Sequence, residues 1–274
     1  MHLVKADTAP RAWLKAARYL EELNSSHDDY DVILHIAEPT VLSVADKQTI
    51  EAVDRFLTSH GGASLHTVAE TIFPKSDYER AGRSGVFEIY PERMSRIHEA
   101  RSDRRWGCYA LRSLRQIDLD GKAFNPLERI IEKMSQAKKY NACYELVPGR
   151  PLRDEEPVSE NVTYYDPATD RNPYYGNLPC LSLASFKFDR KTNQVRLNAT
   201  YRSHYYMQRT LGNLMGLARL QYFVANEVGA EMGPLTVNST YAKLDTGSDA
   251  GGGGGWGMAN MRALIAQCES YYES

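Results

Sequence analysis

Apolar residues recur every three or four positions in several stretches of the chain, which predicts amphipathic helices. The first apolar face runs through Trp13, Leu14, Ala17, Leu20 and Leu23. The second runs through Ile50, Val53, Phe56 and Leu57. Asp46 is its expected N-cap and Gly61-Gly62 its expected end. Similar spacing predicts two more helices, from Pro126 to Met134 and from Met258 to Cys268.

Strand patterns lie between these helices. A short apolar run at residues 31–36 is flanked by polar residues and is typical of a strand. Residues 181–188 and 195–205 are two further strand-like runs, joined by six polar residues that predict a hairpin turn. In the second run apolar and polar residues alternate, so one face of this strand is expected to be apolar and the other polar.

The strongest helical pattern spans residues 211–228 and ends at Gly229. It has so little polar surface that we expect this helix to be central and buried. Two other stretches lack periodicity. Residues 146–177 are rich in Pro, Asp, Glu and Tyr and predict a long loop or insertion. The Gly-rich stretch 247–257 contains five consecutive glycines, and we interpret it as a flexible loop rather than a lid. Helices and strands together predict a single α+β domain over residues 1–274.

The chain has 274 residues, with 33 Lys and Arg against 35 Asp and Glu, and a formal net charge of −2. This balance argues against binding to nucleic acid by bulk charge, so no nucleic-acid partner is expected. No apolar run approaches the roughly 20 residues that span a bilayer, and residues 1–20 lack the apolar core of a signal peptide. The sequence therefore predicts a cytoplasmic protein without a membrane partner.

The cysteines are the first candidates for chemistry. Cys108, Cys143, Cys180 and Cys268 are widely spaced and match no metal-binding pattern, so we expect reduced thiols and no metal site. Cys180 stands directly before the hairpin, and Arg202 lies on its second strand, where the positive charge would stabilise a thiolate. The commoner role of a lone cysteine is that of a small buried residue, just as an isolated histidine such as His204 is more often structural.

The order of elements from Leu178 onward adds to this pattern. It consists of Leu178-Pro179-Cys180, a strand, a turn, a strand ending in Tyr201-Arg202-Ser203, and Leu211-Gly212-Asn213 opening the long helix. This order resembles the thymidylate synthase and deoxycytidylate hydroxymethylase superfamily, with the chain as a divergent member. The resemblance is good over residues 178–243 and weaker over 95–145. It implies a thymidylate synthase-like α+β fold, in which a bent mixed sheet packs on a long buried helix.

By this resemblance, Cys180 is the nucleophile, Arg202 and Ser203 bind the nucleotide phosphate, and Asn213 reads the pyrimidine ring. The segment of residues 235–241, which includes Tyr241, resembles the part of the family that holds the sugar.

Two upstream segments resemble the family as well. Trp106-Gly107-Cys108-Tyr109 is similar to the family's Gly-x-x-Tyr, whose tyrosine assists proton removal. Lys138 and Lys139 stand where the family has an arginine pair that reaches the phosphate site of the partner subunit.

The chemistry explains why such residues are needed. C5 of a uracil or cytosine ring is a poor nucleophile, but a thiolate added to C6 turns C5 into part of an enolate or enamine. The reaction requires an ionised cysteine, a donor that polarises the C4 substituent, and a base for the C5 proton. Cys180, Asn213 and Tyr109 are the candidates for these roles, in that order.

The resemblance therefore implies a transferase that adds a methyl or hydroxymethyl group to C5 of a pyrimidine nucleotide. It implies 5,10-methylenetetrahydrofolate as the donor and a homodimer as the assembly. The amide of Asn213 favours a uracil-like base. The sequence does not decide whether the sugar is ribose or deoxyribose, or whether the reaction is methylation or hydroxymethylation.

Several residues depart from the family pattern and support alternatives to a one-carbon transferase. Leu181 follows the cysteine where synthases have a histidine, Tyr205 replaces an aspartate, and Tyr241 and Lys243 replace a His and a Tyr. One alternative is a pyrimidine-nucleotide-binding protein that kept the fold and lost turnover. Another is an enzyme that uses the C6 adduct for a different electrophile or for C5 proton exchange alone. The last is an α+β domain whose motifs match by chance.

Overall fold

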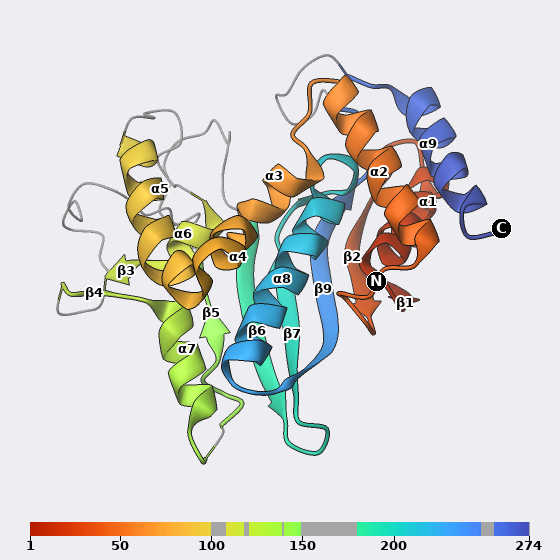
Figure 1. Cartoon of the computed structure of the whole chain (residues 1–274). Helices are drawn as coiled ribbons and strands as arrows, with labels where there is room; N and C mark the ends of the chain where they lie inside the picture. The colour runs from red at the N-terminus through yellow and green to blue at the C-terminus, as the bar shows by residue number, and fades with distance from the viewer. Residues whose placement is uncertain (100–107, 118–120, 139, 149–179, 248–254, 274) are drawn as a thin grey trace.

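The computed structural model describes residues 1–99, 108–117, 121–138, 140–148, 180–247 and 255–273 of the chain. Helices and strands are mixed along the chain, and most of the described strands belong to one open sheet (Figure 1). A small sheet pairs β3 (Gln116–Ile117) with β4 (Ala123–Phe124). The predicted α+β class is confirmed, and its finer assignment to a thymidylate synthase-like fold stays a prediction.

The larger sheet has the strand order β1-β2-β9-β7-β6-β5, and β8 pairs with β9 past the end of β7. Its strands are β1 (His2–Ala6), β2 (Asp28–Ile36), β5 (Glu145–Leu146), β6 (Leu181–Asp189), β7 (Gln194–Tyr201), β8 (His204–Tyr205) and β9 (Glu231–Lys243). β1 is parallel to β2, and β9 is parallel to β7 and β8. The other pairings are antiparallel, so the sheet is mixed.

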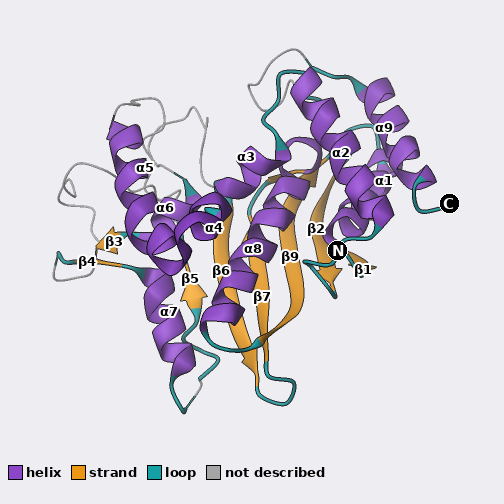
Figure 2. Ribbon diagram, viewed as in Figure 1, coloured by secondary structure: helices purple, strands orange, loops and turns teal. Residues whose placement is uncertain are grey.

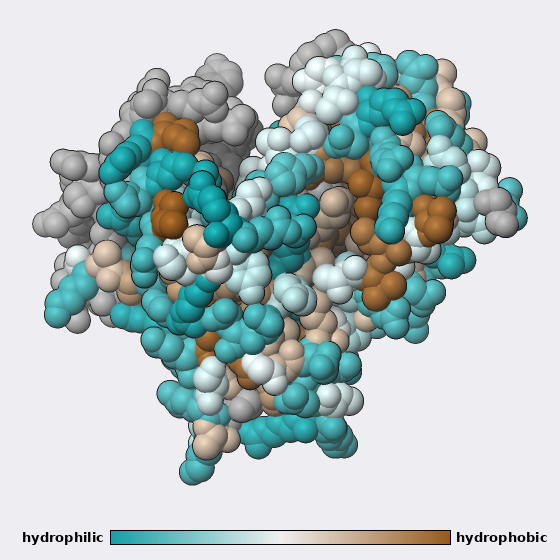
Figure 3. Space-filling model, viewed as in Figure 1, coloured by the Kyte–Doolittle hydropathy of each residue, from teal (hydrophilic) through white to brown (hydrophobic). Residues whose placement is uncertain are grey.

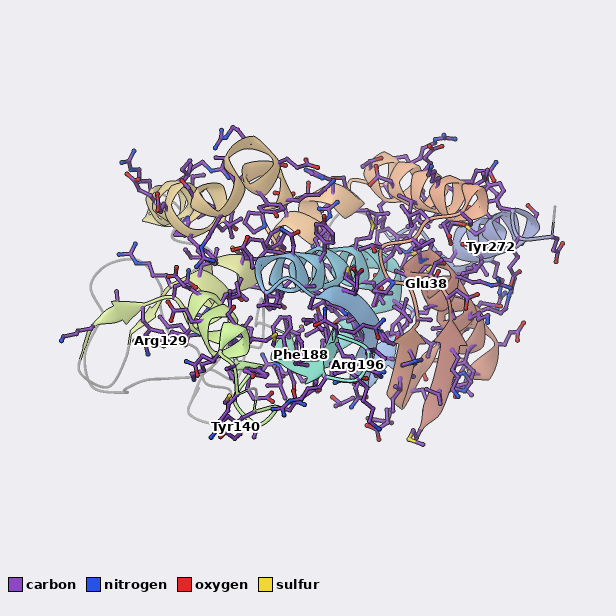
Figure 4. The ribbon with its side chains drawn as sticks, turned by 60° about the horizontal axis from the view of Figure 1, so that its bottom comes forward. Glu38, Arg129, Tyr140, Phe188, Arg196 and Tyr272 are labelled. Atoms are coloured by element: carbon purple, nitrogen blue, oxygen red, sulfur yellow. The ribbon has the colours of Figure 1, made fainter. Side chains whose placement is uncertain are left out.

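The helices gather mainly on one side of this sheet (Figure 2). They are α1 (Ala9–Leu23), α2 (Val44–Ser59), α3 (Leu65–Glu70), α4 (Lys75–Ser84), α5 (Tyr90–Glu99), α6 (Tyr109–Leu114), α7 (Pro126–Ser135), α8 (Leu211–Glu227) and α9 (Met258–Ser270). Two single π-helical turns, η1 (Gly85–Ile89) and η2 (Tyr206–Thr210), precede α5 and α8. In Figure 4 the main helical layer lies above the strands, with α8 directly on the sheet.

The alternation of side chains along the strands explains this layering. In β2, Val32, Leu34 and Ile36 are fully buried and lie opposite β9 residues of the same face. α1 and α8 pack on that face and complete the core. Hydrophilic side chains cover most of the molecular face seen in Figure 3. Among the described residues, no helix is both long enough and apolar enough to cross a bilayer.

The long helix α8 is as buried as the sequence predicts, and two glycines bring it close to α3. A Cβ on Gly212 would lie 2.6 Å from Cβ of Val68, and one on Gly216 would lie 2.9 Å from the carbonyl oxygen of Ala69. Gly212 and Gly216 are one helical turn apart and share a face. Gly212, directly before Asn213, is therefore a packing glycine that lets α3 approach the head of α8.

Local elements agree with the predictions in α1, β2, α7, α8 and α9, and two details are corrected. The N-cap of α2 is Ser43 rather than Asp46; Asp46 is the third residue of α2 and completes a capping box with Ser43. The second hairpin strand ends at Tyr201 instead of residue 205, because the chain turns at Arg202 and Ser203 and β8 pairs with β9.

The last helix is attached through Trp256. This side chain is buried, its indole Nε1 donates to the carbonyl oxygen of Asp245 at 3.0 Å, and its backbone N–H donates to Thr246 at 2.9 Å. Gly247 has a φ of +85°, and a Cβ there would lie 2.7 Å from the Trp256 ring. Residues 248–254 of the Gly-rich stretch 247–257 and residues 149–177 of the predicted loop 146–177 lie outside the described residues. At the start of that loop, Leu146 belongs to β5 instead.

Alanine at Gly212 or Gly216 is expected to destabilise the protein. An added methyl group overpacks the α3–α8 contact, which costs about 1–3 kcal/mol, against a gain of up to about 1 kcal/mol in helix propensity. Urea unfolding should therefore show a loss of about 1–2 kcal/mol in the free energy of unfolding. Tyr222→Ala, at an exposed position of α8, is the control and should change it by less than about 0.5 kcal/mol. An equally stable Gly212→Ala protein would contradict the close packing.

Candidate functional site

Cys180 and Tyr109 meet at the start of β6. Tyr109 is the first residue of α6, and Cys180 stands directly before the strand. The Tyr109 hydroxyl accepts hydrogen bonds from the backbone N–H groups of Cys180, at 2.7 Å, and Leu181, at 3.3 Å. The pairing of β6 with β7 is irregular between Leu181 and Leu183, as in a β-bulge. Two predicted site residues from distant parts of the chain are thus in direct contact.

Arg202 completes this contact from the turn that directly follows the neighbouring strand, β7. Its backbone N–H donates to the carbonyl oxygen of Cys180 at 3.0 Å. The Thr240 hydroxyl binds the carbonyl oxygens of Tyr201, at 3.2 Å, and Arg202, at 3.0 Å, and so ties the end of β7 to β9. The sequence prediction that Arg202 lies beside Cys180 is therefore confirmed.

Burial and positive charge act on Cys180 in opposite directions. Its side chain is half-buried, and burial raises the pKa of the thiol, while the charges of Arg202 and Arg209 lower it. Burial also raises the pKa of Tyr109 well above the ordinary phenol value. Tyr109 is accordingly a neutral phenol at physiological pH, and an ionised thiolate at Cys180 depends on the two arginines.

Asn213 lies at the head of α8, in a buried line of polar groups. Its Nδ2 is 3.0 Å from Nε2 of His204, and Nδ1 of His204 is 2.9 Å from the Ser239 hydroxyl. The Tyr206 hydroxyl is 3.1 Å from the same Ser239 oxygen. The His204 ring stacks on the Tyr201 ring with centroids 4.0 Å apart and an interplanar angle of 3°.

Tyr201 connects this line to the cysteine. It pairs with Leu181 across the hairpin, and its buried phenol has a pKa raised by burial and by the neighbouring Tyr109 and Cys180. In Figure 1 the starts of β6 and α8 lie at the same end of the sheet. Cys180, Tyr109, Arg202 and Asn213 therefore belong to one neighbourhood, with Tyr201 and His204 between the thiol and the amide.

Distant parts of the chain hold the head of α8 in place. Oδ1 of the fully buried Asp245 accepts the backbone N–H groups of Met207, at 2.9 Å, and Gln208, at 3.2 Å. The indole Nε1 of Trp13 donates to the carbonyl oxygen of Tyr206 at 2.6 Å. These contacts fix η2, the turn that leads into Asn213.

Other predicted site residues lie outside this cluster or have other contacts. Ser203 is half-buried and directly follows Arg202. The Tyr241 hydroxyl donates to Oδ2 of Asp28 at 2.9 Å, on the β2 side of β9. Lys138 is exposed and follows α7, close to Asn141, which binds Phe188 near the far end of β6. Lys139 lies outside the described residues.

Lys138 thus lies near the far end of β6, whereas Cys180 stands directly before the first residue of that strand. It does not reach the Cys180 neighbourhood of its own chain. Its predicted contact with a partner subunit stays a prediction.

Two residues of this neighbourhood, Arg209 and Tyr201, were not predicted from the sequence as site residues. Ser239 and Thr240 were included only as members of the segment 235–241 that resembles the sugar-holding part of the family. Arg209 is exposed, and no acidic side chain pairs with it among the described residues. It lies in η2, and its charge lowers the pKa of both Cys180 and Tyr109. In the sequence Tyr201 fits the apolar strand face, and nothing local indicates its stacking on His204. Within the described residues, no three His, Cys, Asp or Glu side chains gather as a metal site would require.

Comparisons with known proteins add no assignment. No protein-family model matches the chain, and no curated protein matches its sequence. A functional assignment therefore depends on the geometry of the site and on the resemblance of its motifs.

Replacing Tyr109 by Phe is expected to destabilise the protein by about 1–3 kcal/mol, since it removes the acceptor of two backbone N–H groups. Tyr201→Phe is the matched control. Its hydroxyl is buried and has no hydrogen-bond partner in the described structure, so its removal should be neutral or stabilising. Thermal and urea unfolding of both variants would check this. Equal losses for the two variants would contradict the assigned contacts.

Alkylation of Cys180 by iodoacetamide should follow a pH profile displaced upward from that of a free thiol, because burial raises its pKa. Arg202→Met and Arg209→Met should each move the profile further upward, since each removes a charge that favours the thiolate. Peptide mass spectrometry would read Cys180 separately from Cys143. If Arg209→Met does not move the pH profile of alkylation, the charge of Arg209 does not act on the thiol.

Proposed function

We propose that the protein is a one-carbon transferase that acts on C5 of a pyrimidine nucleotide through a Cys180 adduct at C6. The observation that carries the proposal is the meeting of Cys180 with the Tyr109 hydroxyl and Arg202, one aromatic ring away from the His204–Asn213 pair. A nucleophile, a neutral hydroxyl, a cation and an amide are the groups this chemistry needs. Their spacing in the sequence resembles the thymidylate synthase and hydroxymethylase superfamily.

The proposed reaction begins when the Cys180 thiol loses its proton and its sulfur bonds to C6. The electron pair of the C5–C6 double bond moves into an enolate or enamine, which makes C5 nucleophilic. C5 then bonds to the electrophilic carbon of the donor while the bond from that carbon to its leaving group breaks, and the C5 proton passes to water. Breaking of the C6–sulfur bond restores the thiolate.

The remaining residues have supporting roles in this proposal. The Asn213 amide pairs with the ring and stabilises charge at its C4 substituent. Tyr109 stays protonated, so it orients the water that takes the C5 proton rather than acting as the base itself. Arg202 and Ser203 bind the phosphate, for which a guanidinium supplies a fork of donors. Arg209 supplies a second positive charge that stabilises the thiolate.

The donor and assembly are proposed from the resemblance of the motifs. Methylenetetrahydrofolate would supply the one-carbon unit. The product would be methylated if the reduced folate also gives a hydride and is itself oxidised, or hydroxymethylated if water adds. A homodimer would bring Lys138 and Lys139 to the phosphate site of the partner subunit, and Tyr241 would contact the sugar.

A second candidate function is pyrimidine-nucleotide binding without turnover. The raised thiol pKa favours it, because a protonated thiol does not add to C6. A related alternative keeps the C6 adduct but uses another electrophile. If the protein is an enzyme, replacement of Cys180 should abolish its chemistry. If it is a binding protein, the wild type should show no chemistry and the replacement should leave nucleotide binding unchanged.

Deuterium uptake at C5 tests the proposal without a choice of donor. UMP, dUMP, CMP and dCMP would be incubated in D₂O with the wild type, Cys180→Ala and the control Cys143→Ala, each with and without methylenetetrahydrofolate. Exchange should occur with the wild type and the Cys143 variant and vanish in Cys180→Ala, because exchange at C5 requires the C6 adduct. A one-carbon product in the folate arm would identify the reaction.

The contrary results are distinct. Nucleotide binding without exchange would support the binding protein, and exchange that persists in Cys180→Ala would exclude this nucleophile. Exchange without a folate product would support a different electrophile.

A further inference from the structure

The C-terminal helix α9 docks on α1 and α2, away from the candidate site. It packs on both helices through its buried apolar side chains. Arg262 of α9 binds the buried Glu21 of α1 at 2.5 Å, and Glu269 binds Arg18. In Figure 1, α9 and α6, the helix that begins at Tyr109, lie on opposite sides of the molecule. Any effect of α9 on the site must therefore pass through intervening residues.

Trp256, just before α9, connects this helix to Asp245. The Trp256 side chain is 2% exposed, and its indole Nε1 donates to the carbonyl oxygen of Asp245 at 3.0 Å. Its backbone N–H donates to the carbonyl oxygen of Thr246 at 2.9 Å. The indole also lies against Gly247, and its ring centroid is 6.0 Å from that of Phe56 in α2. Trp256 thus holds the backbone that follows β9.

Asp245 carries this connection toward the site. Its carbonyl oxygen faces Trp256, while Oδ1 of its carboxylate accepts the backbone N–H groups of Met207, at 2.9 Å, and Gln208, at 3.2 Å. The residue is fully buried and closely packed, so its side chain has little freedom to move independently of its backbone. A shift of the Asp245 backbone therefore moves the carboxylate relative to η2 and weakens both hydrogen bonds.

We infer that Trp256 is a positioning residue, which couples the docking of α9 to the conformation of η2. Because η2 contains Arg209 and leads into Asn213, the coupling extends to the candidate site. Loss of the indole N–H removes a donor from the buried carbonyl group of Asp245, which favours states in which this segment leaves its place. The inference goes beyond the proposed function, because it applies to any chemistry at Cys180.

Amide hydrogen exchange of the full chain, read by NMR, tests the coupling. Trp256→Phe keeps an aromatic ring and the backbone contact with Thr246. In this variant the Met207 and Gln208 amides should exchange about tenfold faster than in the wild type. Phe56→Leu is the matched control. It removes aromatic packing from the same cluster but leaves the indole hydrogen bond in place, so both amides should keep their rates within about twofold.

The pH profile of Cys180 alkylation is a second readout, which a purely structural role of Trp256 would not move. Trp256→Phe should displace the profile upward, because Arg209 lies in η2 and its charge lowers the pKa of the thiol. Phe56→Leu should leave the profile in place.

Tyr272→Phe covers the case in which Trp256→Phe does not fold. The Tyr272 hydroxyl donates to Oδ1 of the buried Asp46 in α2 at 2.6 Å. Its removal loosens the end of α9 without a change at Asp245. The two η2 amides should then exchange about threefold faster than in the wild type.

A double-mutant cycle tests the route through Asp245. Asp245→Ala removes the acceptor of both η2 amides, so their exchange should already be fast. If the coupling passes through Asp245, Trp256→Phe should add nothing in this background. Additional acceleration there would overturn the route.

The contrary results are distinct from a failure of the proposed function. Unchanged amide rates in Trp256→Phe would overturn the coupling, and so would equal acceleration in Trp256→Phe and Phe56→Leu. An unmoved alkylation profile would overturn its extension to Cys180. Neither measurement uses a nucleotide. Absence of C5 exchange in the wild type would overturn the proposed function and leave the coupling standing.

Discussion

The site depends on one buried carboxylate. Asp245 is fully buried, and its Oδ1 receives the backbone N–H groups of Met207 and Gln208, which the turn of η2 leaves without helical partners. Because Asp245 comes just after β9, this contact ties the head of α8 to the central strand of the sheet. It helps to place Arg209, which lies within η2, and Asn213, which lies at the head of α8.

Close packing then restricts what this segment can do. Gly212 and Gly216 bring α8 against α3. Asn213 directly follows Gly212 and therefore has little freedom to shift. On the sheet side, Thr240 holds the carbonyl groups at the end of β7. A binding or catalytic group needs a supporting set of contacts that locks its rotamer, and here these contacts come from α3, β7, β9 and the C-terminal part of the chain.

The parts predictable from sequence are those encoded locally. The periodicity of α1, α7 and α8 and the alternation in β7 require only neighbouring residues, and Cys180 and Arg202 meet because a hairpin brings its two ends together. The insertion of β9 between β2 and β7 is a pairing of distant segments that no local pattern specifies. The same holds for Asp245, Ser239 and Thr240, which act on residues more than thirty positions away. Arg209 could not be predicted for a different reason, since an exposed arginine in a sequence carries no sign of the direction in which a π-helical turn points it.

Two arginines, Arg202 and Arg209, act on the Cys180 thiol, and the electrostatics of the site give each a separate task. Burial opposes the thiolate, and the charge of a single arginine would be shared with any phosphate bound to it. A bound phosphate brings its own negative charge, which weakens the stabilisation that Arg202 gives to the sulfur. Arg209 forms no ion pair with an acidic side chain among the described residues, so no carboxylate there competes with the thiolate for its charge. In the proposed reaction the two tasks are therefore separable: Arg202 holds the anion, and Arg209 keeps the thiolate accessible while the anion is bound.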